Sequence, residues 1–487
     1  MKSLRVRIAV VTLALAVLAA SPSSALPFWG SDEVRAARAL APQPALVLDF
    51  SLSDAAAGKP AGPQQGTIAL AANFNHKAAG GDHVIDDYAL CKTLRWNETE
   101  RRLSSLNCHA LPAFLINELG NRLMLAKVLA AADLKEHGDL GPIWTEMELG
   151  LAGQEPAPLK VRTVGDRTEY LHGSTVAASV SGDAGAASPY EMARLVRLLA
   201  RHLPMHPQIR ADIAKRGSLP ARIEVRYASL GVPPRTTVMT LANLRRETIA
   251  YPLPAGLTSS LRAEAANDPT DRGAAIRRAL TVLDSGGRDG PPSLASLSTR
   301  VKASRDPVEA LMLFLNITQQ YGGAMRSDPA LLDAIIPKIR ASLQDQRAAQ
   351  FWQANALSGD AKAPGDREAA AKYLAGAKSL DALPFGTFRY VTYANLATMT
   401  KSSDQWPVEI RSAMPQNLVD NYWRHIAVYP WAANAYMDAA STYVFDPSNA
   451  WLAYDLGRAI DPQWRTSVLG GVVKYEQHLE ATLPDFF

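Results

Sequence analysis

Asp284-Ser-Gly-Gly-Arg-Asp-Gly-Pro-Pro292 separates two parts of the chain that differ in their hydrophobic pattern. The glycines and prolines of this stretch disfavour both helix and strand. The residues before it mix strand and helix patterns, whereas the residues after it show one helical pattern after another. The sequence therefore predicts a multidomain protein, with an α+β N-terminal domain over residues 26–284, a linker over 285–300 and an all-α helical-hairpin domain over 301–487.

The N-terminal domain contains several runs that are β-rich or that alternate apolar and polar residues. We expect strands at Ala45–Leu52, Thr67–Phe74, Lys160–Val164, Arg167–Leu171, Thr175–Ser181 and Arg222–Tyr227. Two further runs, Thr236–Leu241 and Glu247–Tyr251, are expected to pair beside Arg222–Tyr227. Gly165-Asp166 is a favourable two-residue hairpin turn. A helix is expected after Ser188, because Pro189 and Glu191 then occupy its first and third positions.

The C-terminal domain is predicted to consist of successive antiparallel helices. Two helices open at Asp306 and Asp328, and further helical runs cover about Ser342–Leu357, Arg367–Ser379, Phe388–Met399, Gln416–Ala427, Trp431–Tyr443, Ser448–Ile460 and Gln463–Leu483.

One pair of these helices, within Pro430–Pro462, resembles a tetratricopeptide-type helical hairpin. The second helix has small, aromatic, small and proline residues at the spacing of that motif, at Ala450, Tyr454, Gly457 and Pro462. The first helix offers Ala440 and Tyr443 as a small and aromatic pair. The join from Tyr443 to Ala450 is about two residues shorter than in the motif. The resemblance implies stacked helical hairpins and a surface that binds a protein partner, and it implies no catalysis.

Aromatic residues are concentrated in the same region. The candidates for a partner-binding groove are Trp423, Tyr429, Trp431, Tyr436 and Trp451. Amphipathic rings of this kind line many binding grooves. The alternative, which we favour, is that the rings form the core of the helical domain, because aromatic stripes at helical spacing are usually buried.

The N-terminus has the three parts of a secretory signal peptide. Lys2, Arg5 and Arg7 precede the apolar run Ile8–Ala20, and small residues lead up to a cleavage point after Ala25. Thirteen helical residues span about 20 Å, which is short of a bilayer's ~30 Å hydrocarbon core. We therefore expect residues 1–25 to be removed, no transmembrane segment in the mature chain, and a periplasmic or secreted protein. The Ala- and Arg-rich composition is typical of bacteria.

Charge and motif content exclude several classes of function. The chain has 51 Lys and Arg against 47 Asp and Glu, and removal of three basic residues with the signal leaves 48 − 47 = +1. This balance argues against a nucleic-acid partner. The sequence has no G-x-x-x-x-G-K-[ST], G-x-G-x-x-G, G-x-S-x-G or S-x-x-K pattern, so we expect no nucleotide cofactor and no common serine hydrolase.

Two cysteines, Cys91 and Cys108, are predicted to form a disulfide, because an exported protein enters an oxidising compartment. The alternative is a pair of buried thiols. His109 adjoins Cys108, but the chain has no C-x-x-C pair that would complete a zinc site, so we expect no metal.

Seven of the nine histidines lie before the linker, at His76, His83, His109, His137, His172, His202 and His206. His83 with Asp86, Asp87 and Tyr88 could form a general-base site, and His202 with His206 is the nearest approach to a metal pair. Structural roles are the favoured interpretation of both groups. Arg194, Arg197 and Arg201 share one helix face, which we interpret as solvated rather than as an anion site.

Two functional hypotheses follow. The leading one is an exported, non-enzymatic interaction protein or envelope-associated scaffold that binds a protein partner through its C-terminal helices. The alternative is an exported hydrolase with a histidine-containing site in the N-terminal domain. No catalytic residue is identified from the sequence.

Overall fold

A computed structural model describes residues 30–38, 41–56, 59–60, 62–116, 157–203, 205–229, 232–285, 292–314, 317, 329–345, 419–420, 422–443, 446–461 and 472–487. The predicted signal peptide and the helical runs predicted at Arg367–Ser379 and Phe388–Met399 lie outside these residues.

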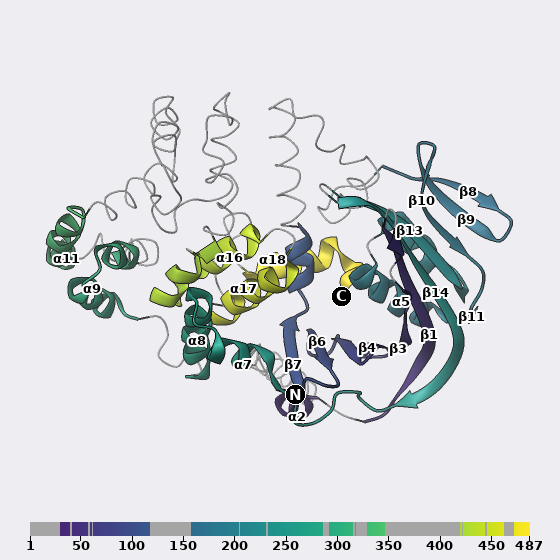
Figure 1. Ribbon diagram of the computed structural model, residues 1–487, viewed down its shortest axis with the longest axis horizontal. Helices are drawn as coiled ribbons and strands as arrows, with labels where there is room; N and C mark the ends of the chain where they lie inside the picture. The colour runs from purple at the N-terminus through teal and green to yellow at the C-terminus, as the bar shows by residue number, and fades with distance from the viewer. Residues whose placement is uncertain are drawn as a thin grey trace, which may run out of the picture.

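The described N-terminal part is built on one curved, 13-stranded sheet (Figure 1). Its order is β15-β7-β6-β5-β4-β3-β1-β14-β13-β10-β9-β8, and β2 pairs with β1. The neighbours are antiparallel except for β15 and β7. The strands are β1 Gln43–Ala56, β2 Lys59–Pro60, β3 Gln64–Ala71, β4 Phe74–Ala79, β5 Asp82–Asp87, β6 Lys92–Asn97, β7 Arg102–Asn107, β8 Lys160–Val164, β9 Arg167–His172, β10 Thr175–Ser181, β13 Arg222–Ser229, β14 Val232–Ile249 and β15 Thr258–Ser259. A separate short pair joins β11 Gly185–Ala186 to β12 Ser218–Leu219.

Several strand predictions are confirmed and two are wrong. The hairpin at Gly165 forms as expected between β8 and β9, with Gly165 at φ +63°. The run Thr67–Phe74 is not one strand, because the chain turns at Ala72-Asn73 between β3 and β4. Thr236–Leu241 pairs beside Arg222–Tyr227 as expected, but Glu247–Tyr251 does not, because its residues 247–249 pair with β1. Most of both runs lies in the single strand β14, where Asn243 at φ +51° marks an irregularity in the pairing with β1.

Two helices after β11 pack against this sheet. The predicted capping box at Ser188 is confirmed, and it opens α5 (Pro189–His202); α6 (Pro207–Ala214) follows with His206 at its N-cap. Figure 1 shows α5 lying inside the curve of the sheet. Its buried side, including Leu195 and Leu199, forms a core with apolar residues of β1 and β3. The opposite face of the sheet carries α2 (Ser31–Ala37) through a second core.

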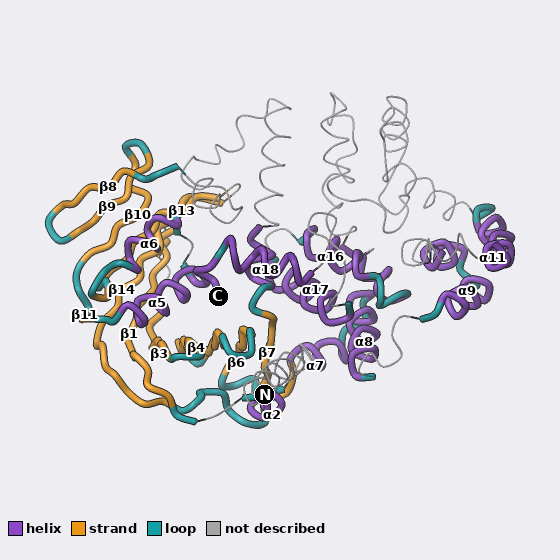
Figure 2. The backbone as a smooth tube through the Cα atoms, turned by 180° about the vertical axis from the view of Figure 1, so that it is seen from behind, coloured by secondary structure: helices purple, strands orange, loops and turns teal. Residues whose placement is uncertain are grey.

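The C-terminal part is helical where it is described (Figure 2). The helices are α7 Ser260–Asn267, α8 Asp271–Asp284, α9 Leu294–Ala303, α11 Pro329–Ser342, α16 Ala433–Thr442, α17 Pro447–Ile460 and α18 Val472–Thr482, followed by the 3₁₀ turn η4 Pro484–Phe486. One core includes Ile276 of α8, Leu297 of α9 and Tyr436 of α16. Helices from both sides of the predicted linker therefore share a core, and the protein combines a large mixed sheet with a helical part. No helix in the described part of the chain is long and apolar enough to cross a membrane.

Gly66 permits the close approach of β3 and β4. A Cβ at this position would lie 1.9 Å from the carbonyl oxygen of Ala78. We expect Gly66→Ala to lower the free energy of unfolding by about 1–3 kcal/mol, the usual cost of overpacking. Urea unfolding followed by circular dichroism measures the change. The matched control is Gly62→Ala, whose Cβ would meet no atom within 4 Å. An equal stability of the two variants would contradict the prediction.

Candidate functional site

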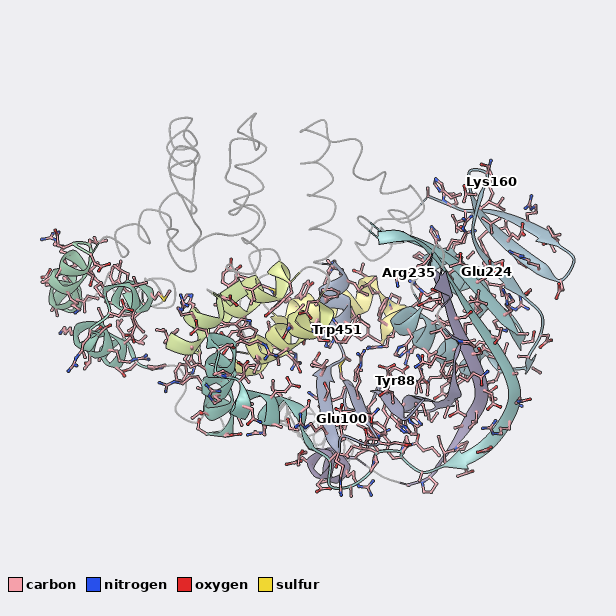
Figure 3. The ribbon with its side chains drawn as sticks, viewed as in Figure 1. Tyr88, Glu100, Lys160, Glu224, Arg235 and Trp451 are labelled. Atoms are coloured by element: carbon pink, nitrogen blue, oxygen red, sulfur yellow. A yellow bond between two sulfur atoms is a disulfide. The ribbon has the colours of Figure 1, made fainter. Side chains whose placement is uncertain are left out.

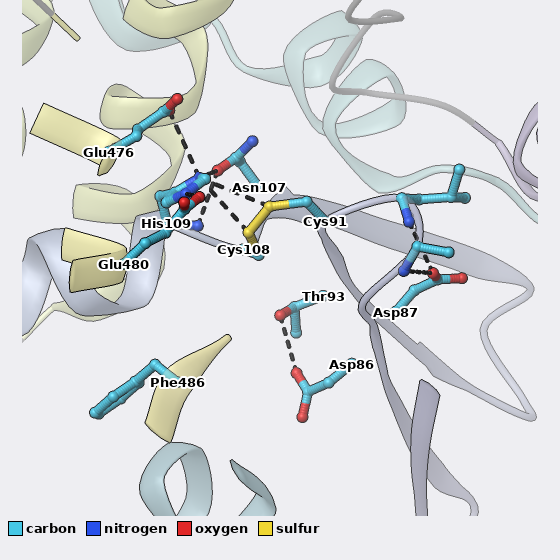
Figure 4. Close-up of a disulfide and its surroundings, with 12 residues drawn as sticks. Asp86, Asp87, Cys91, Thr93, Asn107, Cys108, His109, Glu476, Glu480 and Phe486 are labelled. Atoms are coloured by element: carbon cyan, nitrogen blue, oxygen red, sulfur yellow. Dashed lines mark hydrogen bonds and ion pairs between the residues drawn. A yellow bond between two sulfur atoms is a disulfide. The ribbon is translucent and has the colours of Figure 1, made fainter. Parts of the chain in front are cut away.

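The sheet meets the C-terminal helices at β6 and β7, and the candidate site lies at this junction. Cys91 precedes β6 and Cys108 follows β7, so the two cysteines lie at the same end of neighbouring antiparallel strands. They form a disulfide with a Cα–Cα distance of 4.9 Å (Figure 4). The amide of Cys108 also donates to the carbonyl of Cys91 at 3.0 Å. The predicted disulfide is confirmed in the structure, and it fixes the end of this hairpin.

His109 connects the disulfide to α18. Its Nδ1 lies 2.9 Å from Oδ1 of Asn107 and 3.5 Å from Sγ of Cys108. Its Nε2 lies 2.8 Å from a carboxylate oxygen of Glu480 on α18 (Figure 4). Burial lowers the pKa of His109, although Glu476 and Glu480 oppose this change. The imidazole therefore bridges the sheet and the last helix.

Cys91, Cys108 and His109 have ligand atoms within 4.8 Å of one another. Zinc binds cysteine as the thiolate, and both sulfur atoms here are joined in the disulfide. The oxidised centre described here therefore does not provide the ligand set of a zinc site.

A second contact across the junction is formed by Asp455 of α17. Its Oδ2 accepts a hydrogen bond from the backbone amide of Asn107 at 3.0 Å, and the residue is 1% exposed. Burial raises the pKa of Asp455 to about 6, although the nearby charges of Lys92 and Arg458 lower it. Lys92 is itself buried, and burial lowers its pKa. The junction thus contains charged groups largely removed from water.

The predicted arginine face of α5 is not solvated along its whole length. Arg201 is 2% exposed in its side chain, and its guanidinium donates to the carbonyl of Phe486 at 2.7 Å. Arg194 and Arg197 lie over the ring of Tyr88, at 4.6 and 5.1 Å from its centroid. The solvated-face interpretation is wrong for Arg201, because α5 lies inside the curve of the sheet and this side chain points toward the junction.

The predicted group around His83 is not brought together. Successive residues of a strand point to opposite faces, so Asp86 and Asp87 are separated by the sheet. Asp86 accepts from Thr93 at 3.0 Å and lies 3.1 Å from Nε2 of His202. Burial raises the pKa of Asp86, but Arg201 and His202 outweigh it and hold this pKa well below its ordinary value. Asp87 instead forms an ion pair with Arg38 at 2.7 Å.

His83 lies in a separate stack on the sheet. Its Nδ1 is 3.0 Å from Nε2 of His76, its Nε2 is 3.0 Å from Glu98, and its ring stacks on Trp96. Burial lowers the pKa of His76 to about 4, with a smaller effect of His83. The structure therefore uses His83 in packing and in a hydrogen bond to a surface carboxylate.

His202 and His206 do not form a metal pair with each other in the structure. His202 bonds Asp86, whereas Nδ1 of His206 accepts from the amide of Gln208 at the start of α6. In the sequence, Pro204 lies between the helix that carries His202 and the helix that His206 caps. His137 lies outside the described residues.

The candidate aromatic residues lie in or beside the helical core. Trp423, Tyr429 and Tyr436 are at most 1% exposed and Trp451 is 6% exposed. Trp431 is partly buried and packs 5.7 Å from the ring of Tyr429. Only Trp451 among the five also borders a cavity between the sheet and the described helices.

This cavity has a volume of about 290 Å³. It is bounded by β6, β7, the start of α7 and the start of α17. Its polar lining includes Arg95, Ser105 and Trp451, and the guanidinium of Arg95 lies 5.0 Å from the centroid of the Trp451 ring. The sequence pattern did not identify Arg95 or Ser105, because neither belongs to a motif and their partner Trp451 is more than 340 residues away.

In comparisons with known proteins, no protein-family model matches the chain. No curated protein matches it at a significant level either.

Removal of the disulfide should weaken the hairpin that contacts α18. We expect the double variant Cys91→Ser, Cys108→Ser to lose about 3 kcal/mol of unfolding free energy, the value for a closed loop of this length. Urea unfolding with and without dithiothreitol measures the loss. The reductant should destabilise the parent protein and leave the double variant unchanged, and equal sensitivity of both would contradict a structural disulfide.

Asp455 should make stability depend on pH. Because its folded pKa is about 6, above the unfolded value, its contribution to stability is present below about pH 4 and is lost as the pH rises through 6. We expect the stability of Asp455→Asn relative to the parent to rise by about 3 kcal/mol between pH 4 and pH 7. Urea unfolding at both pH values measures it. The control Asp166→Asn alters an exposed turn. A difference between Asp455→Asn and the parent that is the same at both pH values would refute the prediction.

Proposed function

We propose that this protein is an exported, non-enzymatic scaffold or interaction protein of a bacterial cell envelope, which acts in the periplasm or outside the cell. The signal-peptide pattern of residues 1–25 and the disulfide support export. The proposal further assigns partner binding to the helical part.

One observation carries the non-enzymatic part of the proposal. Two of the N-terminal histidines, His109 and His202, form bonds between distant elements of the fold. His109 joins Glu480 over 371 residues, and His202 joins Asp86 over 116 residues. Each carboxylate holds its imidazole in a contact between the sheet and a helix, and the sulfur atom nearest to His109 is joined in the disulfide. These groups are therefore assigned to architecture rather than to turnover.

The pairing of α16 and α17 supports a tetratricopeptide-type hairpin as the partner-binding unit. Ala440 and Ala450 are 3% and 2% exposed, and Tyr454 is 2% exposed. The motif places small and aromatic residues at these positions so that adjacent helices pack closely. Stacked hairpins of this kind expose the remaining helix faces to partners.

Site-specific photo-cross-linking in intact cells tests the partner. A photoreactive residue at Lys474 of α18 should give one discrete adduct with a protein partner. The same residue at Lys160 of β8, labelled in Figure 3, is the matched control, since both lysines are exposed and Lys160 lies on the sheet whereas Lys474 lies on α18. Absence of an adduct from position 474, or the same adduct from both positions, would contradict partner binding by the helices.

A separate assay tests the absence of catalysis. The purified mature protein should not turn over ester, peptide or glycoside substrates. If the protein does turn over a substrate, the variants His83→Ala and His206→Ala are tested next, with thermal melting as a control for folding. Loss of the turnover in a variant that keeps the parent's thermal stability would replace the scaffold proposal with the hydrolase alternative.

A further inference from the structure

The cavity at the junction is enclosed by elements that are distant in sequence. Arg95 and Ser105 come from neighbouring strands β6 and β7, and Trp451 comes from α17. Figure 3 places Trp451 where the helices meet the sheet. Because β15 pairs only with the first two residues of β7, the rest of that strand's edge faces α7 and α17.

Three buried polar atoms of this lining have no hydrogen-bond partner among the described residues. They are Nε of Arg95, Oγ of Ser105 and Nε1 of Trp451. Ser105 and Trp451 are 5% and 6% exposed. An unpaired buried donor costs about 1–3 kcal/mol, so three at one cavity are unusual. The two nitrogen atoms can only donate, so they cannot satisfy each other and need an external acceptor.

Arg95 supplies the positive charge of the cavity lining that is available to a ligand. The other arginine, Arg272, already bonds Asn449 at 3.0 Å and Asp268 at 3.2 Å, and lies 3.8 Å from Glu264. No described residue forms a hydrogen bond or ion pair with Arg95. The charge of nearby Asp86 is shared with Arg201 and His202. Arg95 therefore brings to the cavity a guanidinium with no hydrogen-bonded carboxylate among the described residues.

The remaining walls are apolar. Four leucines line the cavity, at Leu103, Leu106, Leu261 and Leu452, beside the Trp451 ring. The volume of about 290 Å³ is at the lower end of the range for small-molecule sites. The site thus offers the donors of Arg95 and Trp451 side by side, with hydrocarbon around them, while Ser105 pairs with Leu94 and lies on the other face of the β6–β7 pair.

We propose that this cavity binds a small carboxylic acid with an apolar body. The carboxylate, with one negative charge and two acceptor oxygens, matches the single unpaired guanidinium and the adjacent indole N–H. A phosphate monoester carries −1.5 to −2 charges, for which the lining has no second free cation among the described residues. The cavity borders α17 of the proposed partner-binding hairpin, but ligand binding and the cross-link at position 474 are measured separately, so either proposal can fail alone.

Isothermal titration calorimetry on the full mature protein at pH 7 tests the proposal with hexanoate, its neutral analogue hexanamide, and inorganic phosphate as probes. Hexanoate should bind at least tenfold more tightly than the other two. Arg95→Gln should weaken hexanoate binding about 10- to 100-fold, the range for a hydrogen bond to a charged group. Trp451→Phe keeps a ring and removes the donor, and it should weaken binding severalfold without loss of thermal stability.

The matched control is Arg102→Gln, which changes the same residue type at an exposed position of β7 outside the cavity lining. It should leave the affinity unchanged. Three outcomes would overturn the proposal: no binding of hexanoate, equal binding of hexanamide, or an affinity that Arg95→Gln and Trp451→Phe both leave intact. Tighter binding of phosphate would overturn the carboxylate assignment. Thermal melting of each variant separates a lost contact from a lost fold.

Discussion

The antiparallel ladder between β1 and β14 is the constraint on which the rest of the structure depends. It joins residues about 190 positions apart, as in the hydrogen bond from Asn243 to Asp49. Strands β3 to β7 extend the sheet from β1, and β13 to β8 extend it from β14. The curvature of the combined sheet encloses α5 and brings the edge at β7 against the helices (Figure 2). The disulfide centre and the cavity both lie at this edge, where the C-terminal helices cover β7.

Local features of the fold could be predicted from the sequence, because short-range chemistry determines them. The capping box at Ser188 and the turn at Gly165 depend only on neighbouring residues, and both form as expected. Strands β5 to β7 were not predicted, because residues such as Asp86 and Thr93 interrupt the apolar pattern. Asp86 and Thr93 can be buried because His202 and Arg201, which are more than 100 residues away, bond their side chains. Such compensation of a polar residue by a distant partner leaves no periodic signal.

The contacts of the candidate site were even harder to predict from the sequence, because most of them join residues far apart in the chain. The disulfide was predictable from the cysteine count and the export signal, but the partners of His109 were not. Glu480 and Asp455 look like ordinary helix-surface residues in the sequence, and the structure shows that they meet the end of β7. The general-base group proposed around His83 is not assembled, because the period of two in a strand sends Asp86 and Asp87 to opposite faces. Proximity in sequence is therefore a poor guide to proximity across a sheet.

The position of η4 has a consequence for the order of folding. Phe486 is 1% exposed, and Arg201 and Arg210 hold its carbonyl and the carboxylate of Asp485 inside the curve of the sheet. Residues 484–486 are synthesised long after the strands that surround them. The interior of the sheet is consequently completed late, and the hairpin closed by Cys91 and Cys108 can form far earlier. Contacts of such long sequence separation make folding slow, so the nascent chain passes through a stage in which Arg201 of α5 and Arg210 of α6 lack their final acceptors.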